Sequence, residues 1–172
     1  MVNAIQFRGS PSGKVLQTTF ALPAVKPDEV LVKVTHSGIC GSDLHQLQKP
    51  LVLGHEGKPY YSTLTLRKIS TMWSVAHWKP LTGIGIIEEV GSASSLFKVG
   101  DRVGWAVVNS SCGHCEVCMV GKDAYCPNAS QYSAHDFDVH GSVCNYVVRK
   151  EQWIFRIPDA LSSEDAAPLM CE

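Results

Sequence analysis

Residues 84–108 read IGIIEEVGSASSLFKVGDRVGWAVV, and this stretch decides the fold class. Its two ends, 84–90 and 102–108, are short runs rich in valine and isoleucine, which predicts two β-strands. Gly100 and Asp101 supply the turn that leads into the second strand. Neither run repeats its apolar residues with the helical period of 3.6 residues. The stretch therefore predicts β-structure.

Further short strands are predicted on both sides of this stretch, at 15–20, 29–35 and 143–148. The segment 29–35 places valine at every second position, which is the pattern of a half-buried strand. One helix is predicted at 161–167, where Ser162 can cap it and acidic residues fill its first turn. Few other segments have a helical period, so we expect a mainly β domain, a small barrel with short helices.

The composition is that of a globular domain without an obvious charged partner. The chain has 172 residues, of which 45% are hydrophobic and 18% charged, a length that suits one domain. A formal net charge of -1 gives no basic field for nucleic acid or an anionic membrane. No apolar run is long enough to span a bilayer, and the N-terminal residues lack the order of a secretory signal. A cytosolic protein is therefore expected.

Four of the seven cysteines lie close together, in the order Cys112, Cys115, Cys118 and Cys126. Thiolates two residues apart can reach one ion from a tight turn, and four of them complete the tetrahedral shell of a structural zinc ion. Such spacing fits metal-binding thiolates in a reducing compartment better than a secreted disulfide framework. The cluster therefore predicts a closed, structural zinc site.

Two alternatives to zinc exist for this cluster. An iron–sulfur cluster also uses Cys-x2-Cys-x2-Cys, but it places three residues before the last cysteine, whereas this chain has seven. The other alternative is four unligated cysteines brought together by coincidence.

Gly113 and Gly121 relax the backbone where the cysteine-containing loop must curl. His114, between the first two cysteines, is expected to be a surface side chain and not a ligand.

A second metal site is a hypothesis drawn from scattered residues, namely Cys40, His55 beside Glu56, and Cys171. Catalytic zinc needs three protein ligands and an open position, and two cysteines with one histidine are a known set. Alternatively, each cysteine is a small buried hydrophobe and the histidine a surface residue. The residues alone leave both readings open. Cys144, in a predicted strand, is expected to be a packing residue.

Several motifs of the chain together resemble a known family. They are GICGSDLH at 38–45, GHEG at 54–57, VGDRV at 99–103, the four-cysteine lobe, and AAPLMC at 166–171. In this combination the chain resembles the N-terminal domain of zinc-dependent alcohol dehydrogenases, in the medium-chain dehydrogenase/reductase superfamily. The cinnamyl-alcohol-type and microbial branches are the most similar. The resemblance implies a GroES-like β-barrel that carries a four-cysteine zinc lobe.

The resemblance also implies which residues surround a catalytic zinc ion. Cys40, His55 and Cys171 match the family's catalytic zinc ligands. Glu56 matches the acid beside the ligand histidine, which can approach the metal during ligand exchange. Asp43 matches a carboxylate that orients His55, as metal-bound imidazoles generally require.

Two further residues match the proton relay of the family. Ser42 matches the hydroxyl that takes the substrate proton, and His45 matches the outer end of the relay. In the family, zinc polarises the alcohol oxygen so that hydride can pass to a nicotinamide ring. The resemblance therefore implies a small-molecule alcohol or aldehyde substrate, NAD or NADP, and two zinc ions per intact chain. It also implies that full-length members can form homo-oligomers.

The chain departs from the family pattern in lacking a dinucleotide-binding motif. The family continues into a doubly wound α/β domain whose glycine-rich turn receives the pyrophosphate of the cofactor. Gly83 and Gly85 lie in a strand context without the third glycine of that motif. We therefore expect the cofactor-binding domain to be absent and the chain alone to lack dehydrogenase turnover. The alternative function is a non-catalytic zinc-binding fragment that folds around structural zinc.

The segment 58–83 is the second departure. Its 26 residues hold four basic side chains, no acidic one and two of the four tryptophans, with no helical or strand period. Its removal joins Gly57 to Ile84 and restores the family pattern. We interpret 1–172 as one domain interrupted by an atypical insertion at 58–83, which is either a retained intron read in frame or a surface loop.

Overall fold

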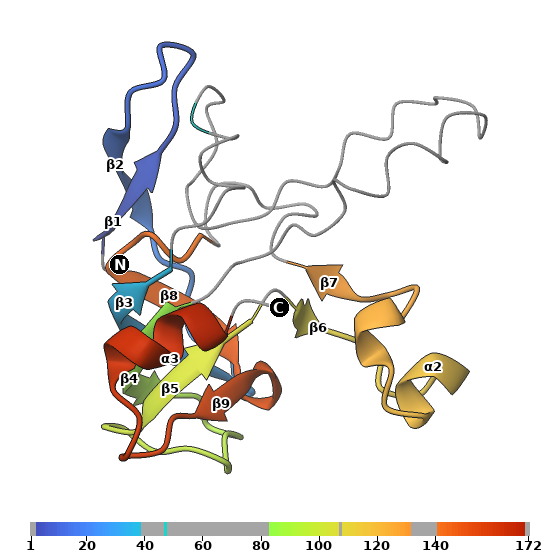
Figure 1. The fold of residues 1–172 in the computed structure, drawn as a ribbon. Helices are drawn as coiled ribbons and strands as arrows, with labels where there is room; N and C mark the ends of the chain where they lie inside the picture. Colours follow the sequence, from blue (N-terminus) through green and yellow to red (C-terminus); the bar gives the residue numbers. More distant parts are fainter. Residues whose placement is uncertain (1–2, 39–46, 48–82, 107, 132–140, 171–172) are drawn as a thin grey trace, which may run out of the picture.

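The structure is a computed structural model that describes residues 3–38, 47, 83–106, 108–131 and 141–170. Within these ranges the chain forms nine strands, two α-helices and two 3-10 helices (Figure 1). In chain order they are β1 (Asn3–Arg8), β2 (Leu16–Ala21), β3 (Glu29–Ser37), β4 (Gly83–Val90), β5 (Arg102–Trp105), β6 (Val108–Ser110), α2 (Glu116–Met119), η2 (Asp123–Tyr125), β7 (Ser130–Gln131), β8 (Tyr146–Lys150), η3 (Glu151–Trp153), β9 (Ile154–Arg156) and α3 (Ser163–Leu169).

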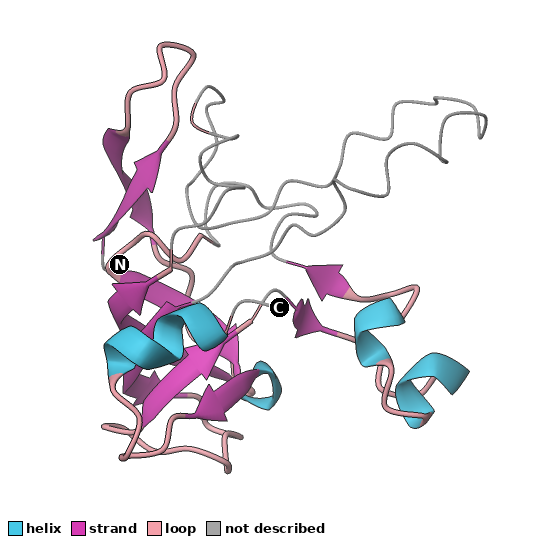
Figure 2. Ribbon diagram, viewed as in Figure 1, coloured by secondary structure: helices cyan, strands magenta, loops and turns pink. Residues whose placement is uncertain are grey.

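An antiparallel sheet of five strands, in the order β8-β3-β4-β5-β9, forms the body of the domain (Figure 2). The strands β1 and β2 form a separate hairpin, and β6 and β7 form a two-stranded stem. The β3–β4 ladder shifts register after Leu31 and again after Val34. Such irregularities bend and twist the strands, which lets the sheet curl around its core. The expected mainly β fold with short helices is confirmed.

The core lies on the face of the sheet where the apolar residues of β3 and β4 alternate. Val30 and Val32 of β3 are fully buried, as are Ile87 of β4 and Trp105 of β5. Full burial of a valine or isoleucine side chain stabilises a fold by roughly 1.5–3 kcal/mol. The alternation read from the sequence of 29–35 therefore sets the buried face of this strand.

The start of β4 is fixed by close packing between Gly83 and Trp105. The two residues are paired across the β4–β5 ladder. A Cβ atom on Gly83 would lie 2.1 Å from Cζ2 of Trp105, so this position requires glycine. The Arg149 guanidinium lies 5.2 Å from the centre of the Trp105 ring, a favourable cation–π arrangement.

The turn predicted at Gly100 and Asp101 is confirmed. Gly100 has a φ of +91°, in the left-handed region that favours glycine. The Asp101 carboxylate accepts a hydrogen bond from the Lys98 N–H at 3.0 Å and another from the Arg156 guanidinium at 2.9 Å. This turn therefore joins the β4–β5 connection to β9.

Two predicted strand boundaries are wrong. The strand predicted at 102–108 ends at Trp105, because its partners Gly83 and Ile154 are the first residues of β4 and β9. The strand predicted at 143–148 begins only at Tyr146 and runs to Lys150. Residues 143–145 bond mainly to β1, with an isolated bridge between Gln6 and Cys144, and only the Asn145 carbonyl accepts a hydrogen bond from β3, from the Val34 N–H at 2.9 Å.

The helix predicted at 161–167 is confirmed as α3, with Ser162 at its N-cap. The Ser162 hydroxyl accepts a hydrogen bond from the Asp165 N–H at 3.1 Å, which satisfies one of the unpaired donors of the first turn. The buried Ala166 and Ala167 pack this helix against Ile84 of β4. None of the helices in the described ranges has the length and apolar character needed to cross a membrane.

Candidate metal centre

The four clustered cysteines lie in a lobe that the β6–β7 stem holds away from the sheet (Figure 1). Cys115 caps the short helix α2, which contains Cys118, and Cys126 follows η2. The Met119 N–H donates to the Cys115 carbonyl at 2.9 Å, and the Cys126 N–H donates to the Asp123 carbonyl at 3.0 Å. These local turns direct the thiols toward one another.

Two glycines make the tight turns of the lobe possible, as the sequence predicts. Gly113 has a φ of +73° and Gly121 a φ of +74°. A residue with a side chain would be strained at either position, because the left-handed region costs roughly 1–2 kcal/mol for other residues. The backbone can therefore reverse direction directly after Cys112 and again after α2.

The four sulfur atoms are spaced for a single tetrahedral ion. All four lie within 4.8 Å of one another. The sulfurs of Cys115 and Cys118 lie 3.4 Å apart, and the Cys126 sulfur lies 3.5 Å from that of Cys112 and 3.8 Å from that of Cys115. Zinc–sulfur bonds of about 2.3 Å in a tetrahedron imply an edge of about 3.8 Å. A disulfide needs about 2.05 Å, and the five described cysteines are free thiols.

This spacing also separates the alternatives that the sequence leaves open. An iron–sulfur cluster would place several iron and sulfide atoms between the thiolates, which requires a wider ring of cysteine sulfurs than one ion does. Four unligated cysteines would have no reason to converge on one point. The site therefore fits a mononuclear tetrahedral metal, for which zinc is the expected ion.

The electrostatics of the lobe favour a bound cation. The backbone N–H groups of His114 and Cys115 lower the pKa of the Cys112 thiol to about 6. The Cys118 N–H acts to lower the pKa of Cys115, but the neighbouring sulfurs and burial outweigh it and raise this pKa to about 11. Once one thiolate forms, its neighbours resist ionisation, and a divalent cation would remove that resistance.

The rest of the lobe offers little other stabilisation. Among the described side chains of 108–129, Cys126 is the only buried one. The Asn128 N–H donates to its sulfur at 3.3 Å. The sequence does not predict this hydrogen bond, because the donor is a backbone group that any residue except proline would supply. The only sequence feature that points to it is the turn after Pro127.

Two further expectations are confirmed, one for His114 in the lobe and one for Cys144 beside the sheet. His114 is exposed, and its Nδ1 lies 2.6 Å from the Cys112 carbonyl oxygen, so its ring is turned to the backbone and away from the thiols. Cys144 packs half-buried against the core cluster of the sheet. Its sulfur donates to the Gly141 carbonyl at 3.0 Å, and burial raises the pKa of its thiol to about 12.

The residues predicted for the second metal site lie outside the described residues. The described elements that lead toward them are β3, which ends at Ser37, and α3, which ends at Leu169. The residues outside the described ranges are Cys40, Ser42, Asp43, His45, His55, Glu56 and Cys171.

A profile of the family described as "Alcohol dehydrogenase GroES-like domain" matches residues 26–58 and 76–159. Among curated proteins, an alcohol dehydrogenase of Geobacillus stearothermophilus is 32% identical over 157 residues, which is 87% of this chain and 38% of that protein. A probable cinnamyl alcohol dehydrogenase of Eucalyptus gunnii is 31% identical over 166 residues, 94% of this chain and 41% of that protein. The chain thus spans about two fifths of the length of these relatives.

Solved structures of alcohol dehydrogenases also match nearly the whole of this chain and less than half of their own length. A cinnamyl alcohol dehydrogenase of Sorghum bicolor matches 99% of this chain and 45% of its own with a TM-score of 0.73 and 26% identity. CAD of Helicobacter pylori in complex with NADP(H) matches 99% of this chain and 46% of its own, with the same TM-score and identity.

Proposed function

The chain belongs to the alcohol dehydrogenase GroES-like domain family, and on that premise we propose that it is the zinc-carrying part of an oxidoreductase. The reaction is the interconversion of alcohols with aldehydes or ketones, coupled to NAD or NADP. The substrate is a small molecule, and the protein works in the cytosol. The relatives named as alcohol and cinnamyl alcohol dehydrogenases support this class of reaction.

The observation that carries this proposal is the four-cysteine cluster in the lobe of the barrel. Its sulfurs all lie within 4.8 Å of one another, which suits one structural zinc ion held by Cys112, Cys115, Cys118 and Cys126. A closed shell of four thiolates leaves no position for substrate. The structural zinc therefore holds the lobe, and the chemistry needs a second site.

The second site is proposed at Cys40, His55 and Cys171, with the fourth position open to substrate. Two thiolates and one imidazole are a donor set that zinc accepts in catalytic sites. Zinc bound there supplies Lewis acidity at the substrate oxygen. Asp43 would fix the orientation of the His55 ring, and Glu56 would stand beside that ligand.

The proposed proton path uses two side chains of the same segment. Ser42 would accept the hydroxyl proton of the alcohol, and His45 would pass it toward solvent. A histidine suits this role because its ordinary pKa lies close to neutral pH. Both residues would act on the proton, and a bound nicotinamide cofactor would supply the acceptor for the hydride.

Cobalt(II) substitution of the purified chain tests the proposal without depending on turnover. Cobalt in place of zinc gives absorption bands whose intensity follows the number of thiolate ligands. We expect two classes of band, one lost in Cys40→Ser and the other in Cys118→Ser, whereas the control Cys144→Ser keeps both. Alcohols and aldehydes should shift only the bands that depend on Cys40. A chain whose Cys40 variant binds as much cobalt as the wild type would contradict the proposed catalytic site.

A further inference from the structure

The four cysteines of the lobe are not evenly spaced, and the two shortest distances between their sulfurs involve different residues. The sulfurs of Cys115 and Cys118 lie 3.4 Å apart, and those of Cys112 and Cys126 lie 3.5 Å apart. The sulfurs of Cys112 and Cys118 are 3.8 Å apart, as are those of Cys115 and Cys126. The closest contacts therefore divide the cluster into two pairs that share no member.

The first pair, Cys115 and Cys118, is held by the geometry of α2. Cys115 is the N-cap residue of this helix and Cys118 is its third residue. Side chains at these two positions lie on the same side of the first turn, which is why they also meet in a capping box. Sulfurs in a disulfide are about 2.05 Å apart, so an approach of about 1.4 Å would join this pair within one helical turn.

The second pair, Cys112 and Cys126, joins the two ends of the lobe. Cys126 follows η2, and its N–H donates to the Asp123 carbonyl at 3.0 Å. Gly113, with a φ of +73°, reverses the backbone directly after Cys112. A bond between these two sulfurs would close the loop that contains α2 and η2. Two disulfides in these pairs would therefore hold the lobe in place of a metal ion.

The thiols of the lobe differ in how easily a small oxidant reaches them. Cys112, Cys115 and Cys118 are half-buried, whereas Cys126 is only 6% exposed. The thiolate is the nucleophilic form of cysteine, and four thiolates around one divalent ion keep a net negative charge. The segment 108–131 holds a single lysine and no arginine to offset that charge. Each pair therefore includes a nucleophilic sulfur that solvent can reach.

We propose that the lobe is a site of reversible oxidation, at which a peroxide joins Cys115 to Cys118 and Cys112 to Cys126 and releases the zinc ion. The inference rests on the structural zinc site of the proposed function. The thiolate is also the form of cysteine that binds metal. A disulfide has no thiolate, so oxidation of both pairs removes every ligand of the ion.

The chemistry of each pair takes two steps, written here for hydrogen peroxide. An accessible thiolate attacks the peroxide, so that a sulfur–oxygen bond forms, the oxygen–oxygen bond breaks and hydroxide leaves. The second thiolate of the pair attacks the resulting sulfenic acid, so that the disulfide forms, the sulfur–oxygen bond breaks and a second hydroxide leaves. Each disulfide thus consumes one peroxide, which is reduced as the two sulfurs are oxidised. In the second pair Cys112 is the sulfur attacked first, because Cys126 is buried.

Cys144 is the internal comparison for this reactivity. Its thiol donates to the carbonyls of Gly141 at 3.0 Å and Tyr146 at 3.3 Å. Burial raises the pKa of this thiol to about 12, so it holds little thiolate at neutral pH. Cys144 should therefore stay reduced while the lobe is oxidised.

The test uses the full chain loaded with zinc and reads zinc and disulfides instead of activity. Hydrogen peroxide is added in steps, a chromogenic chelator measures the released zinc, and mass spectrometry maps the disulfides after free thiols are blocked. We expect the two disulfides named above to form as the ion leaves the lobe. A thiol reductant with added zinc should reverse both changes, and the matched variant Cys144→Ser should behave like the wild type.

The Cys40→Ser variant, which lacks the proposed second site, shows that the released ion comes from the lobe, since it should hold and release one zinc ion per chain. Zinc that stays bound in excess peroxide would overturn the inference and leave the structural zinc site standing. Zinc loss with Cys112–Cys118 and Cys115–Cys126 disulfides, or with sulfinic acids in place of disulfides, would overturn it as well. A Cys40→Ser chain that holds no zinc before oxidation would instead contradict the structural zinc site, and this inference with it.

Discussion

Glu151 shows how a single buried carboxylate can organise a loop. It accepts hydrogen bonds from the Ser94 hydroxyl and from the N–H groups of Ser95 and Leu96, both at 3.0 Å. Burial acts to raise the pKa of Glu151, but these three donors outweigh it and lower the pKa. Its folded pKa thus lies below its unfolded value of about 4.3. The stabilisation is therefore present above that value and is lost as pH falls through the folded pKa.

We predict that Glu151→Gln lowers the free energy of unfolding at pH 7 by about 1–3 kcal/mol, because the charge-assisted hydrogen bonds are lost. The cost should shrink as the pH falls below the unfolded pKa of about 4.3, and it should vanish only once the pH passes through the lower folded pKa of Glu151. Urea unfolding at pH 7 and at acidic pH measures the difference. Glu88→Gln is the control, since Glu88 forms an exposed ion pair with Lys33. An equal cost of Glu151→Gln at both pH values would contradict this account.

Gly83 is a position at which the packing of the fold requires glycine. We predict that Gly83→Ala destabilises the chain by about 1–3 kcal/mol, the usual cost of overpacking a core, because its methyl group would overlap the Trp105 ring. Near-ultraviolet circular dichroism should change with it, since the tryptophan must move. Gly13→Ala is the comparison for the tryptophan signal: nothing lies within 4 Å of a Cβ there, so its cost of roughly 1–2 kcal/mol comes from a backbone φ of +73° and should leave the near-ultraviolet spectrum unchanged. If both variants lose the same stability with an unchanged tryptophan signal, packing against Trp105 is not the reason for this glycine.

At the scale of the elements, the lobe and the sheet are stabilised by different means. The sheet has a core of buried valine, isoleucine and tryptophan side chains, whereas Cys126 is the only buried side chain described in the lobe. We predict that a zinc chelator at neutral pH abolishes amide protection in α2 and η2 and leaves β3 and β4 protected. Hydrogen exchange read by mass spectrometry distinguishes the two regions. Protection of α2 that persists in the metal-free chain would show that the lobe folds without its ion.

The strands β3 and β4 make a second prediction about elements. Ser37 and Gly83 are paired, so the chain leaves and re-enters the sheet at neighbouring points. Removal of 58–83 would place Gly57 at the position where Trp105 requires glycine. Loop-closure entropy changes slowly with length, by less than about 1 kcal/mol when a loop is halved. We therefore expect this deletion variant to fold with nearly unchanged denaturation in urea; a variant that cannot fold would contradict the interpretation of 58–83 as an insertion.

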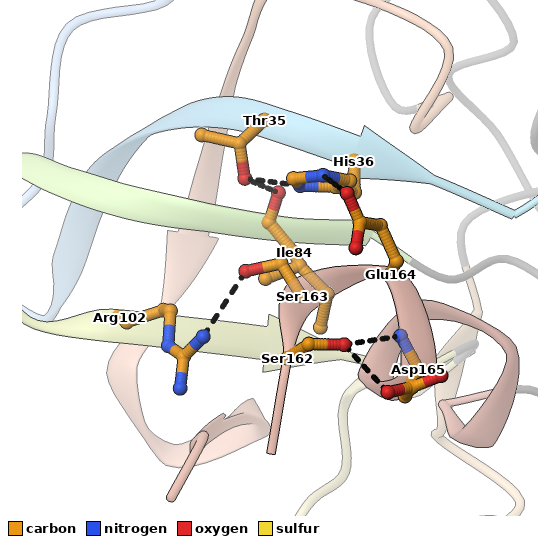
Figure 3. Close-up of polar contacts among 8 residues, drawn as sticks. All are labelled: Thr35, His36, Ile84, Arg102, Ser162, Ser163, Glu164 and Asp165. Carbon is orange, nitrogen blue, oxygen red and sulfur yellow. Dashed lines mark hydrogen bonds and ion pairs between the residues drawn. The ribbon is translucent and has the colours of Figure 1, made fainter. Parts of the chain in front are cut away.

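At the scale of the whole molecule, the features that could be predicted from the sequence are those that depend on local chemistry. The alternating valines of β3, the Ser162 cap and the four-cysteine spacing each depend on a few neighbouring residues, and all three agree with the structure. The end of β5 at Trp105 was not predictable, because it is set by where two distant strands begin. The hydrogen bonds of the Arg102 guanidinium to the carbonyls of Pro158 and Leu161 and to the Ser163 hydroxyl (the last drawn in Figure 3) were hidden for the same reason, since these acceptors lie more than fifty residues away.

The most direct test of the central claim is the zinc content of the purified chain, measured by elemental analysis together with the thiol count of the native protein. The account predicts two zinc ions per chain, with Cys40 and Cys171 protected from thiol reagents along with the four cysteines of the lobe. One zinc ion, with Cys40 and Cys171 freely reactive, would contradict the claim that this chain carries the catalytic zinc site.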